Sequence, residues 1–357
     1  MSDLQRATSI EEYCPTPVKH EFDATNCKKL IVYVQGDLTK IDQRAVFLTV
    51  HDLGCNHNAW VQFLEHPVMK ETRERSIFIH VVVPGQDDNA EDLPSEMTFP
   101  TMQQISEDLP GVLDKLEVKL VIGLGEGAGA NILARFAMAA PDRCMGLILI
   151  HCTASSAGVM EHFKDKFISW KLSSGVPSSA EQYLIIHKFG NRLVEQLESA
   201  ENKESLIKEF QDRLQSKINP RNLRKYVEAF LKRSDFSSKL ESKLGVETLL
   251  VTGSKASHVN AVHTMHQACN KTKASLLKID DVGDVLSETP DKFAQSLLLF
   301  CKGLGVLTSV PLTGVDRPRM GSASGKGGLV RQRTMSMEEY DTPNLRRFSF
   351  SSITPAN

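Results

Sequence analysis

The sequence predicts an α/β fold, built on a mostly parallel, doubly wound sheet with a helical cap insertion. Short apolar runs such as IFIHVVV, GLILI and TLLV are typical of strands buried on both faces, as in a parallel sheet. Segments with helical spacing alternate with these runs, which favours a doubly wound sheet. The connection over residues 153–245 is rich in helix formers, so we expect a helical cap there rather than a loop.

The predicted elements follow one another along residues 28–307, which we interpret as one folded domain. The short connection between the first two strands allows them to form a hairpin. The predicted strands are Leu30–Val34, Ala45–Val50, Ser76–Val83, Leu120–Ile122, Leu147–Ile150, Thr248–Val251 and Ser275–Ile279. The predicted helices outside the cap are Met102–Leu116, Ala128–Ala140, Val259–Asn270 and Pro290–Gly303.

The composition is that of an ordinary globular protein. Of 357 residues, 41% are hydrophobic and 24% are charged, and the formal net charge is −2. This balance lacks the sequence-wide positive field that drives non-specific nucleic-acid binding, so no nucleic-acid partner is expected. No apolar run approaches the ~18 residues of a membrane span, and the first residues do not resemble a secretory signal. Seven scattered cysteines without a CxxC motif disfavour a zinc site. We expect a cytoplasmic protein without cofactor or metal.

Two polar segments flank the predicted domain. Residues 1–27 are expected to form a flexible N-terminal arm. Residues 308–357 carry seven Lys or Arg against four Asp or Glu, and they are rich in Ser, Thr, Gly and Pro. Such a composition has little apolar surface to offset the entropy of ordering. We therefore expect a disordered, basic, Ser/Thr-rich tail.

A glycine-rich turn between a strand and a helix lies in VIGLGEGAGANILAR, Val121–Arg135. A dinucleotide-binding loop is disfavoured because the turn follows several strands, and a P-loop is excluded because no Gly-Lys-Ser/Thr follows. The remaining pattern is the G-x-S-x-G nucleophile elbow of α/β-hydrolases, in which small residues allow a strained turn. Aligned on Gly123 and Gly127, this elbow places Gly125 at the nucleophile position, where no nucleophile is available.

The other two positions of a Ser–His–Asp triad can be located independently. The acid normally follows the strand after the cap, where this sequence has Ala256. The catalytic His normally precedes the last helix, where Asp284 follows Gly283. None of the three side chains can take the part that its position requires in the proton relay, so no catalytic residue is expected.

The residues around the lost triad predict a vestigial pocket. Its oxyanion loop contains His51, Asp52 and Leu53, and the backbone N–H groups of Leu53 and Glu126 could converge there. The carboxylates of Asp52 and Glu126 would disfavour a developing oxyanion. Two alternatives remain open, namely a hydrolase with a relocated nucleophile and a small-molecule sensor that uses this pocket.

Several histidines could rebuild a site in displaced form. His258, His263 and His266 cluster in the sequence, but no carboxylate or Cys completes a metal-ligand set, so a polar helix face is the simpler interpretation. The pair His151-Cys152 ends a strand at the edge where open α/β sheets bind ligands. Adjacent strand residues point to opposite faces, which disfavours a catalytic dyad.

The tail carries a second specific pattern. Arg331-Gln332-Arg333-Thr334-Met335-Ser336 has the R-x-R-x-x-S spacing of a basophilic Ser/Thr kinase substrate, and Arg346-Arg347-Phe348-Ser349 is a looser match. Each phosphate would add about −1.5 to −2 charges. Two phosphates would cancel the tail's positive charge, which predicts a charge switch controlling a protein partner or a transient contact with a membrane surface. The candidate phosphorylation sites are Ser336, Thr334 and Ser349.

Two strings of residues carry a family resemblance. They are Val50-His51-Asp52-Leu53-Gly54 with Asn56, and Gly127-Ala128-Gly129-Ala130 followed by Ile132-Leu133-Ala134-Arg135. With these strings the chain resembles the N-myc downstream-regulated protein family, over about residues 28–307 and in its Ser/Thr-rich basic tail. The resemblance implies an α/β-hydrolase fold without catalytic residues and a cytosolic, non-enzymatic protein. It further implies links to growth, differentiation, stress response and trafficking, with a tail that is a kinase substrate.

Overall fold

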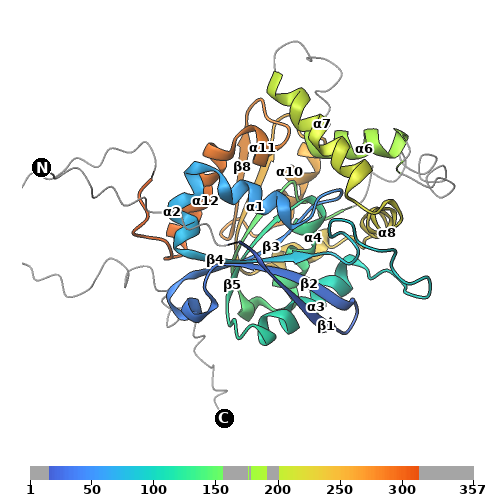
Figure 1. The fold of residues 1–357 in the computed structure, drawn as a ribbon. Helices are drawn as coiled ribbons and strands as arrows, with labels where there is room; N and C mark the ends of the chain where they lie inside the picture. The colour runs from blue at the N-terminus through green and yellow to red at the C-terminus, as the bar shows by residue number, and fades with distance from the viewer. Residues whose placement is uncertain (1–15, 156–175, 177, 191–200, 313–357) are drawn as a thin grey trace, which may run out of the picture.

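The computed structural model describes residues 16–155, 176, 178–190 and 201–312 (Figure 1). Within them, eight strands form a single sheet in the order β1-β2-β4-β3-β5-β6-β7-β8. β1 and β2 pair antiparallel with each other, β2 pairs antiparallel with β4, and all other neighbouring strands are parallel. The strands are β1 Val18–Ala24, β2 Lys28–Gln35, β3 Ala45–Val50, β4 Ser76–Val82, β5 Val121–Glu126, β6 Cys144–Ile150, β7 Glu247–Gly253 and β8 Ala274–Ile279. The mostly parallel sheet confirms the predicted fold class.

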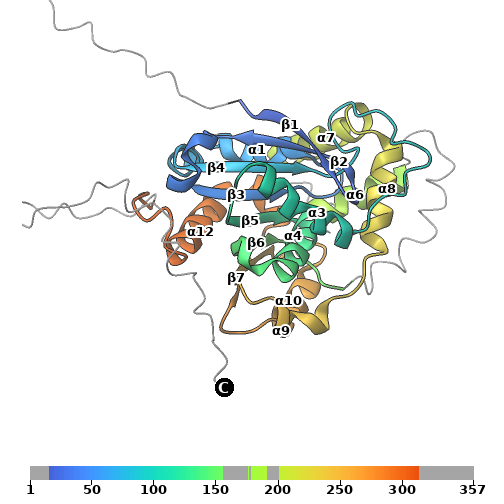
Figure 2. The same cartoon turned by 90° about the horizontal axis from the view of Figure 1, so that it is seen from below.

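Helices cover both faces of this sheet (Figure 2). On one face, α1 (His57–Glu65) and α12 (Pro290–Gly303) bury Trp60 and Phe293 in one apolar core. On the other face, α3 (Met102–Lys115), α4 (Gly127–Ala139) and α10 (Val259–Ala268) contribute to a second core. Strands covered on both faces must be apolar throughout, which explains the continuous apolar runs of the sequence.

The predicted N-terminal arm is wrong over residues 18–24, because these residues form β1. β1 pairs with β2 from Val18 opposite Val34 to Ala24 opposite Lys28. As the edge strand, β1 leaves most of its side chains exposed or half-buried, so its sequence VKHEFDA lacks a continuous apolar pattern. Its polarity reflects its edge position and does not indicate disorder. Residues 1–15 lie outside the described residues.

The predicted hairpin between Leu30–Val34 and Ala45–Val50, the segments that form β2 and β3, is also wrong. β4 lies between β2 and β3, with Ile79 opposite both Val34 of β2 and Leu48 of β3. The connection through the 3-10 helix Leu38–Gln43 therefore crosses to the far side of β4. β5 is longer than predicted, since Gly123 and Gly125 continue the pairing with β6 although they add nothing to the apolar pattern.

Where the structure describes the insertion between β6 and β7, it is mostly helical, as predicted. Asn219 caps α8 by accepting the N–H groups of Arg221 and Asn222, and Pro220 starts the helix. The described helices are α6 (Ser178–Phe189), α7 (Glu201–Ser216), α8 (Pro220–Leu231), the 3-10 helix Ser237–Lys239 and α9 (Leu240–Lys243).

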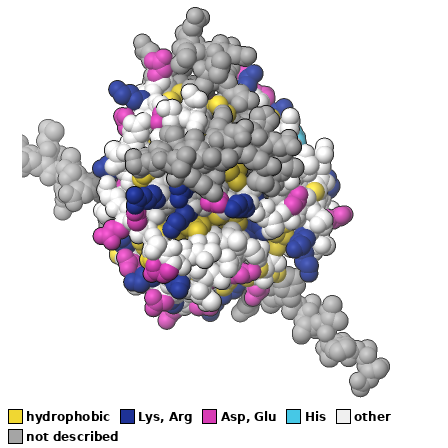
Figure 3. Space-filling view, turned by 90° about the vertical axis from the view of Figure 1, so that its right-hand side faces the viewer, with side chains coloured by type: hydrophobic (Ala, Val, Ile, Leu, Met, Phe, Trp, Pro, Cys, Tyr) yellow, Lys and Arg dark blue, Asp and Glu magenta, His cyan; other side chains and the backbone are white. Residues whose placement is uncertain are grey.

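On the face drawn in Figure 3, Lys and Arg side chains gather across the middle, with carboxylates around them. Among the described helices, none is long and apolar enough to cross a membrane.

Candidate functional site

The sharp turn from β5 into α4 is centred on Gly127. β5 ends at Glu126, and Gly127 adopts a φ of +50°, the left-handed conformation that a nucleophile elbow imposes on its central residue. Gly125 lies inside β5, opposite Val50 and Leu149. The prediction that Gly125 holds the nucleophile position is therefore wrong by two residues.

The corrected elbow reads Gly125-Glu126-Gly127-Ala128-Gly129. A Cβ on Gly125 would come within 2.8 Å of the Ala130 nitrogen, and a Cβ on Gly129 would overlap the Val50 carbonyl. These two glycines thus permit the close strand–helix packing that the flanking positions of an elbow require. Alternating glycines allow two alignments of the motif, and only the turn geometry distinguishes them. Both alignments leave a glycine where the nucleophile would be.

The carboxylate of Asp52 takes the two N–H groups that would stabilise an oxyanion. Its Oδ1 accepts the Ala128 N–H at 2.8 Å, and the Leu53 N–H also donates to this carboxylate. An α/β-hydrolase forms its oxyanion hole from these positions, the residue after the nucleophile and the loop after β3. Leu53 was predicted to contribute, whereas the second donor is Ala128 and not Glu126. A Cβ on Gly127 would overlap this carboxylate.

Asp52 is held in place by the cap. His187 at the end of α6 places its Nε2 2.9 Å from Asp52 Oδ2, and its Nδ1 lies 3.3 Å from Nε2 of His258. Burial alone would raise the pKa of Asp52, but His187 and the two N–H donors hold it well below its usual range. Burial and the neighbouring His187 lower the pKa of His258 to about 3. At neutral pH, Asp52 is ionised and His258 is neutral.

A second buried cluster lies beside the first. The ammonium of Lys188, also on α6, is 3.1 Å from Glu126 Oε1 and 3.4 Å from Asp284 Oδ2. Burial raises the pKa of Glu126 to about 8, because Lys188 offsets only part of that cost and Asp284 and Asp52 add repulsion. For Asp284, Lys188 and Ser287 outweigh burial and lower the pKa. At neutral pH the proton therefore resides on Glu126, and Asp284 carries the charge that pairs with Lys188.

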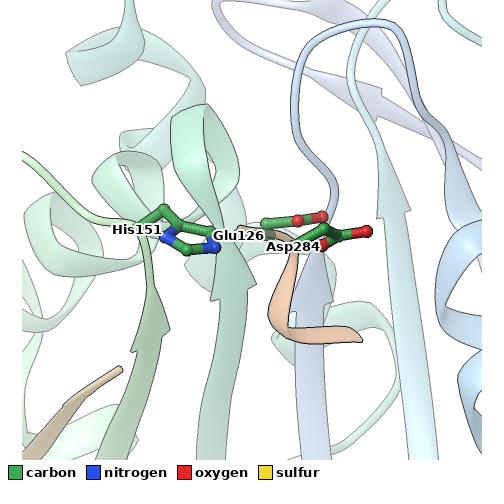
Figure 4. A group of neighbouring side chains, drawn as sticks. All are labelled: Glu126, His151 and Asp284. Atoms are coloured by element: carbon green, nitrogen blue, oxygen red, sulfur yellow. The ribbon is translucent and has the colours of Figure 1, made fainter. Parts of the chain in front are cut away.

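Glu126, Asp284 and His151 offer ligand atoms within 4.8 Å of one another (Figure 4). His151 Nε2 and Asp284 Oδ1 are buried without a hydrogen-bond partner, and one imidazole with two carboxylates is a donor set that can hold a divalent cation. The ammonium of Lys188 contacts both carboxylates and already supplies the balancing positive charge. A metal ion would have to displace this tethered cation and the Glu126 proton.

The other residues that the sequence analysis singled out differ in whether they reach the site. His51 is buried: its Nε2 accepts the Val83 N–H at 3.1 Å, its Nδ1 lies 2.9 Å from the Asp52 carbonyl, and burial lowers its pKa to about 4. Ala256 follows β7 as expected, but His258 is the side chain of that loop that reaches the site. The three histidines that are close in the sequence have different contacts: His258 lies beside His187, whereas His266 on α10 contacts the Ala274 carbonyl. The tail candidates Ser336, Thr334 and Ser349 lie outside the described residues.

The sequence reasoning missed His187 and Lys188. They stand in the helical segment EQYLIIHKF, where two adjacent basic residues end an apolar run. This is a weak signal, because such residues are also common in the last turn of exposed helices. In the fold they reach carboxylates that are distant in the sequence, with His187 135 residues after Asp52 and Lys188 62 residues after Glu126.

Comparison with known proteins agrees with this geometry. The structural alignment with an esterase from Thermogutta terrifontis covers 80% of this chain and 99% of the esterase, with a TM-score of 0.64 and 16% sequence identity. The alignment with a hydrolase from Pseudomonas aeruginosa covers 79% of this chain and 97% of the hydrolase, with a TM-score of 0.63 and 18% sequence identity. These likenesses show the α/β-hydrolase fold.

Sequence relatives are more specific. An uncharacterized protein of Caenorhabditis elegans is 47% identical over 91% of this chain and 93% of its own. Protein NDRG1 of Xenopus tropicalis is 31% identical over 88% of this chain and 78% of its own. The model of the Ndr family matches residues 20–308, from within β1 to just beyond α12. This chain therefore belongs to the Ndr family.

Proposed function

We propose that this protein is a non-enzymatic signalling or adaptor protein of the N-myc downstream-regulated type. It acts in the cytoplasm through protein partners, in growth, differentiation, stress response or trafficking. One observation carries the non-enzymatic part: the Asp52 carboxylate accepts the N–H groups of Leu53 and Ala128 beside Gly127. An oxyanion hole that holds a carboxylate cannot stabilise a second negative charge, and glycine offers no nucleophile.

The neighbouring thiol does not support a relocated nucleophile. Cys55 is buried, and burial raises the pKa of its thiol to about 12, so the thiolate is scarce at neutral pH. Among the described residues, the imidazole of His187 faces Asp52 and His258. Neither partner is a hydroxyl or thiol that this imidazole could activate as a general base.

Ester hydrolysis by the full-length chain tests this part of the proposal. A panel of p-nitrophenyl esters of increasing acyl length should give no turnover above that of His187→Gln, whose imidazole is removed. Asp52→Asn serves as a second comparison, because it removes the negative charge from the oxyanion hole while keeping the size of the side chain. Turnover by the natural chain that disappears in either variant would establish a hydrolase and overturn the proposal.

Regulation is proposed to act through the tail. A basophilic Ser/Thr kinase would phosphorylate Ser336, Thr334 or Ser349, and the added charge would change contacts with protein partners or, transiently, with a membrane surface. Affinity purification with the full chain and with a chain ending at Leu307 tests this. The proposal is supported if the same partners are lost from the truncated chain and from a full-length chain in which Ser336 and Ser349 are changed to Glu. An identical partner set for all three chains would contradict it.

A further inference from the structure

A cavity of about 350 Å³, lined by both apolar and charged side chains, lies apart from the hydrolase-type site. It opens between α3, α4 and the segment that contains α9, on the face of the sheet that Figure 2 presents. Its volume is sufficient for a small ligand. The polar residues that line it are Gln103, Arg135, Ser234, Asp235, Lys239 and Lys243.

Arg135 is the buried cation of this cavity, and only 3% of its surface is exposed. Its guanidinium donates to Asn131 Oδ1 at 2.9 Å, to Gln103 Oε1 at 3.2 Å, and to the hydroxyl and carbonyl of Ser234. It also lies over the ring of Phe236 at 4.7 Å. All these acceptors are neutral, and no described carboxylate forms an ion pair with Arg135. The guanidinium is thus held rigidly by neutral acceptors, and the nearby carboxylate of Asp235 acts on its charge without forming an ion pair.

Further positive charge surrounds this guanidinium. Arg233 is also buried, and its Nη atoms donate to neutral oxygens of Phe230, Thr153 and Ser155. Lys239 and Lys243, four residues apart, are exposed at the cavity, and neither forms an ion pair with another described residue.

One carboxylate opposes these cations within the cavity lining. Asp235 is exposed, and its Oδ1 accepts the Ser237 N–H at 2.7 Å. A single acid faces the charges of Arg135, Lys239 and Lys243, so the lining carries a net positive charge. Arg135 is the buried charge of this set, and a bound anion would offset the cost of burying it beside two further cations.

We propose that this cavity binds the phosphate group of a phosphate monoester, either a soluble one or a lipid headgroup. Four of the five N–H groups of the Arg135 guanidinium already donate to protein acceptors, so Arg135 contributes mainly its positive charge. The two lysines, on flexible stems, supply the donors that can reach the phosphate oxygens. Three cations favour a dianion over a singly charged carboxylate. This site is independent of the non-enzymatic role proposed above.

Calorimetric titration of the full chain with glycerol 3-phosphate at low salt tests the proposal. The double variant Lys239→Gln/Lys243→Gln should bind at least tenfold more weakly, and Asp235→Asn should bind more tightly because it removes the opposing charge. Lys292→Gln, which removes one positive charge on α12 at the other face of the sheet, should bind as the natural chain does. Both lysines are exposed, so we expect these variants to fold, and their thermal unfolding midpoints check this.

Sedimentation with phosphatidylcholine vesicles, with and without phosphatidic acid, separates the two sources. Binding to glycerol 3-phosphate without vesicle binding indicates a soluble ligand, and vesicle binding that requires phosphatidic acid and both lysines indicates a lipid headgroup. The proposal is overturned if neither probe binds the natural chain, or if the double variant binds as the natural chain does.

Discussion

At the scale of single residues, Glu126 has the most unusual environment of the site. It is buried beside Asp284, while a single ammonium, that of Lys188, contacts both carboxyl groups. Two carboxyl groups cannot both ionise cheaply against one cation, so burial and Asp284 raise the pKa of Glu126 to about 8. The proton on Glu126 is therefore part of the folded structure at neutral pH.

This protonation predicts a pH dependence of stability. Between the ordinary value of 4.5 and the folded value of about 8, folded Glu126 holds a proton that the unfolded chain has released. Its contribution to the free energy of unfolding is therefore complete below about pH 4.5 and is lost as the pH rises through 8. We expect Glu126→Gln, which mimics the protonated acid, to gain stability relative to the natural chain between pH 5 and 9 in urea denaturation.

The exposed Glu65 supplies the control, since Glu65→Gln changes the same chemical group at the surface of α1. Its unfolding free energy should follow that of the natural chain at every pH. If the difference between Glu126→Gln and the natural chain does not change from pH 5 to 9, Glu126 is not protonated in the fold.

At the scale of elements, the β5–α4 turn and helix α6 shape the site. The turn places Gly127 against the Asp52 carboxylate, and α6 brings a histidine and a lysine to three buried carboxyl groups. Asp52 thus couples the turn to α6, and Lys188 couples α6 to the loop after β8. Changes in either element should affect the other through these contacts.

We expect Gly127→Ala to be destabilising, because a Cβ meets a positive φ and overlaps the Asp52 carboxylate. Combining it with Asp52→Gly removes the overlap, so the double variant should lose at least ~1 kcal/mol less than the sum of the single variants. Urea denaturation of the four chains measures this coupling. Gly111→Ala in α3 is the matched control: its Cβ meets nothing within 4 Å, and it should stabilise by about 0.5–1 kcal/mol. If the effects of Gly127→Ala and Asp52→Gly on the free energy of unfolding were additive, the contact between Gly127 and Asp52 would be contradicted.

The anchoring of α6 makes a separate prediction. Lys188→Met leaves the buried Asp284 carboxylate without its cation, which typically costs about 3–5 kcal/mol. Hydrogen exchange of residues 178–189 should accelerate, and Lys188→Met/Asp284→Asn should recover part of the lost stability. Lys208→Met on the exposed face of α7 should leave exchange in α6 unchanged. Unchanged exchange in Lys188→Met would show that the ion pair does not hold the helix.

At the scale of the whole molecule, buried neutral histidines recur on both sides of the sheet. Burial lowers the pKa of His57 and His151 to about 4 and that of His80 to about 3. His51 and His258, described above, are lowered in the same way. All five take up a proton more readily in the unfolded chain.

These histidines predict sensitivity to acid. Because their folded pKa values are depressed, their contribution to stability is complete above about pH 6.5 and is lost as the pH falls toward 4. The free energy of unfolding should therefore fall steeply as the pH falls from 6.5 to 4. Protonation of Glu126 raises this free energy over the same range, but by less than the histidines lower it. His80→Gln should reduce the slope of the unfolding free energy against pH by up to ~1.4 kcal/mol per pH unit, which is the value for the uptake of one proton. Equal slopes for His80→Gln and the natural chain would contradict this account.

The fold class followed from local patterns, but β1 and the partners of β2 did not. The spacing of apolar residues can be read from a short stretch of sequence, so continuous apolar runs indicated the central strands. The polar segment VKHEFDA becomes a strand because the edge of β2 is available to it. Likewise, the insertion of β4 between β2 and β3 depends on contacts that no short window of sequence contains.

Short strings of the sequence were sufficient to predict a mostly parallel sheet. They also showed that no residue can play its part in a Ser–His–Asp triad, since Asp284 stands at the position of the histidine. The folded structure was needed to establish that Gly127 rather than Gly125 is the centre of the elbow, since that assignment depends on the φ angle of the turn. It also decided that Asp52 accepts the oxyanion-hole N–H groups and that His187 and Lys188 hold the cap. These contacts join residues far apart in the chain, and their electrostatic strength arises from burial, which exists only in the folded state.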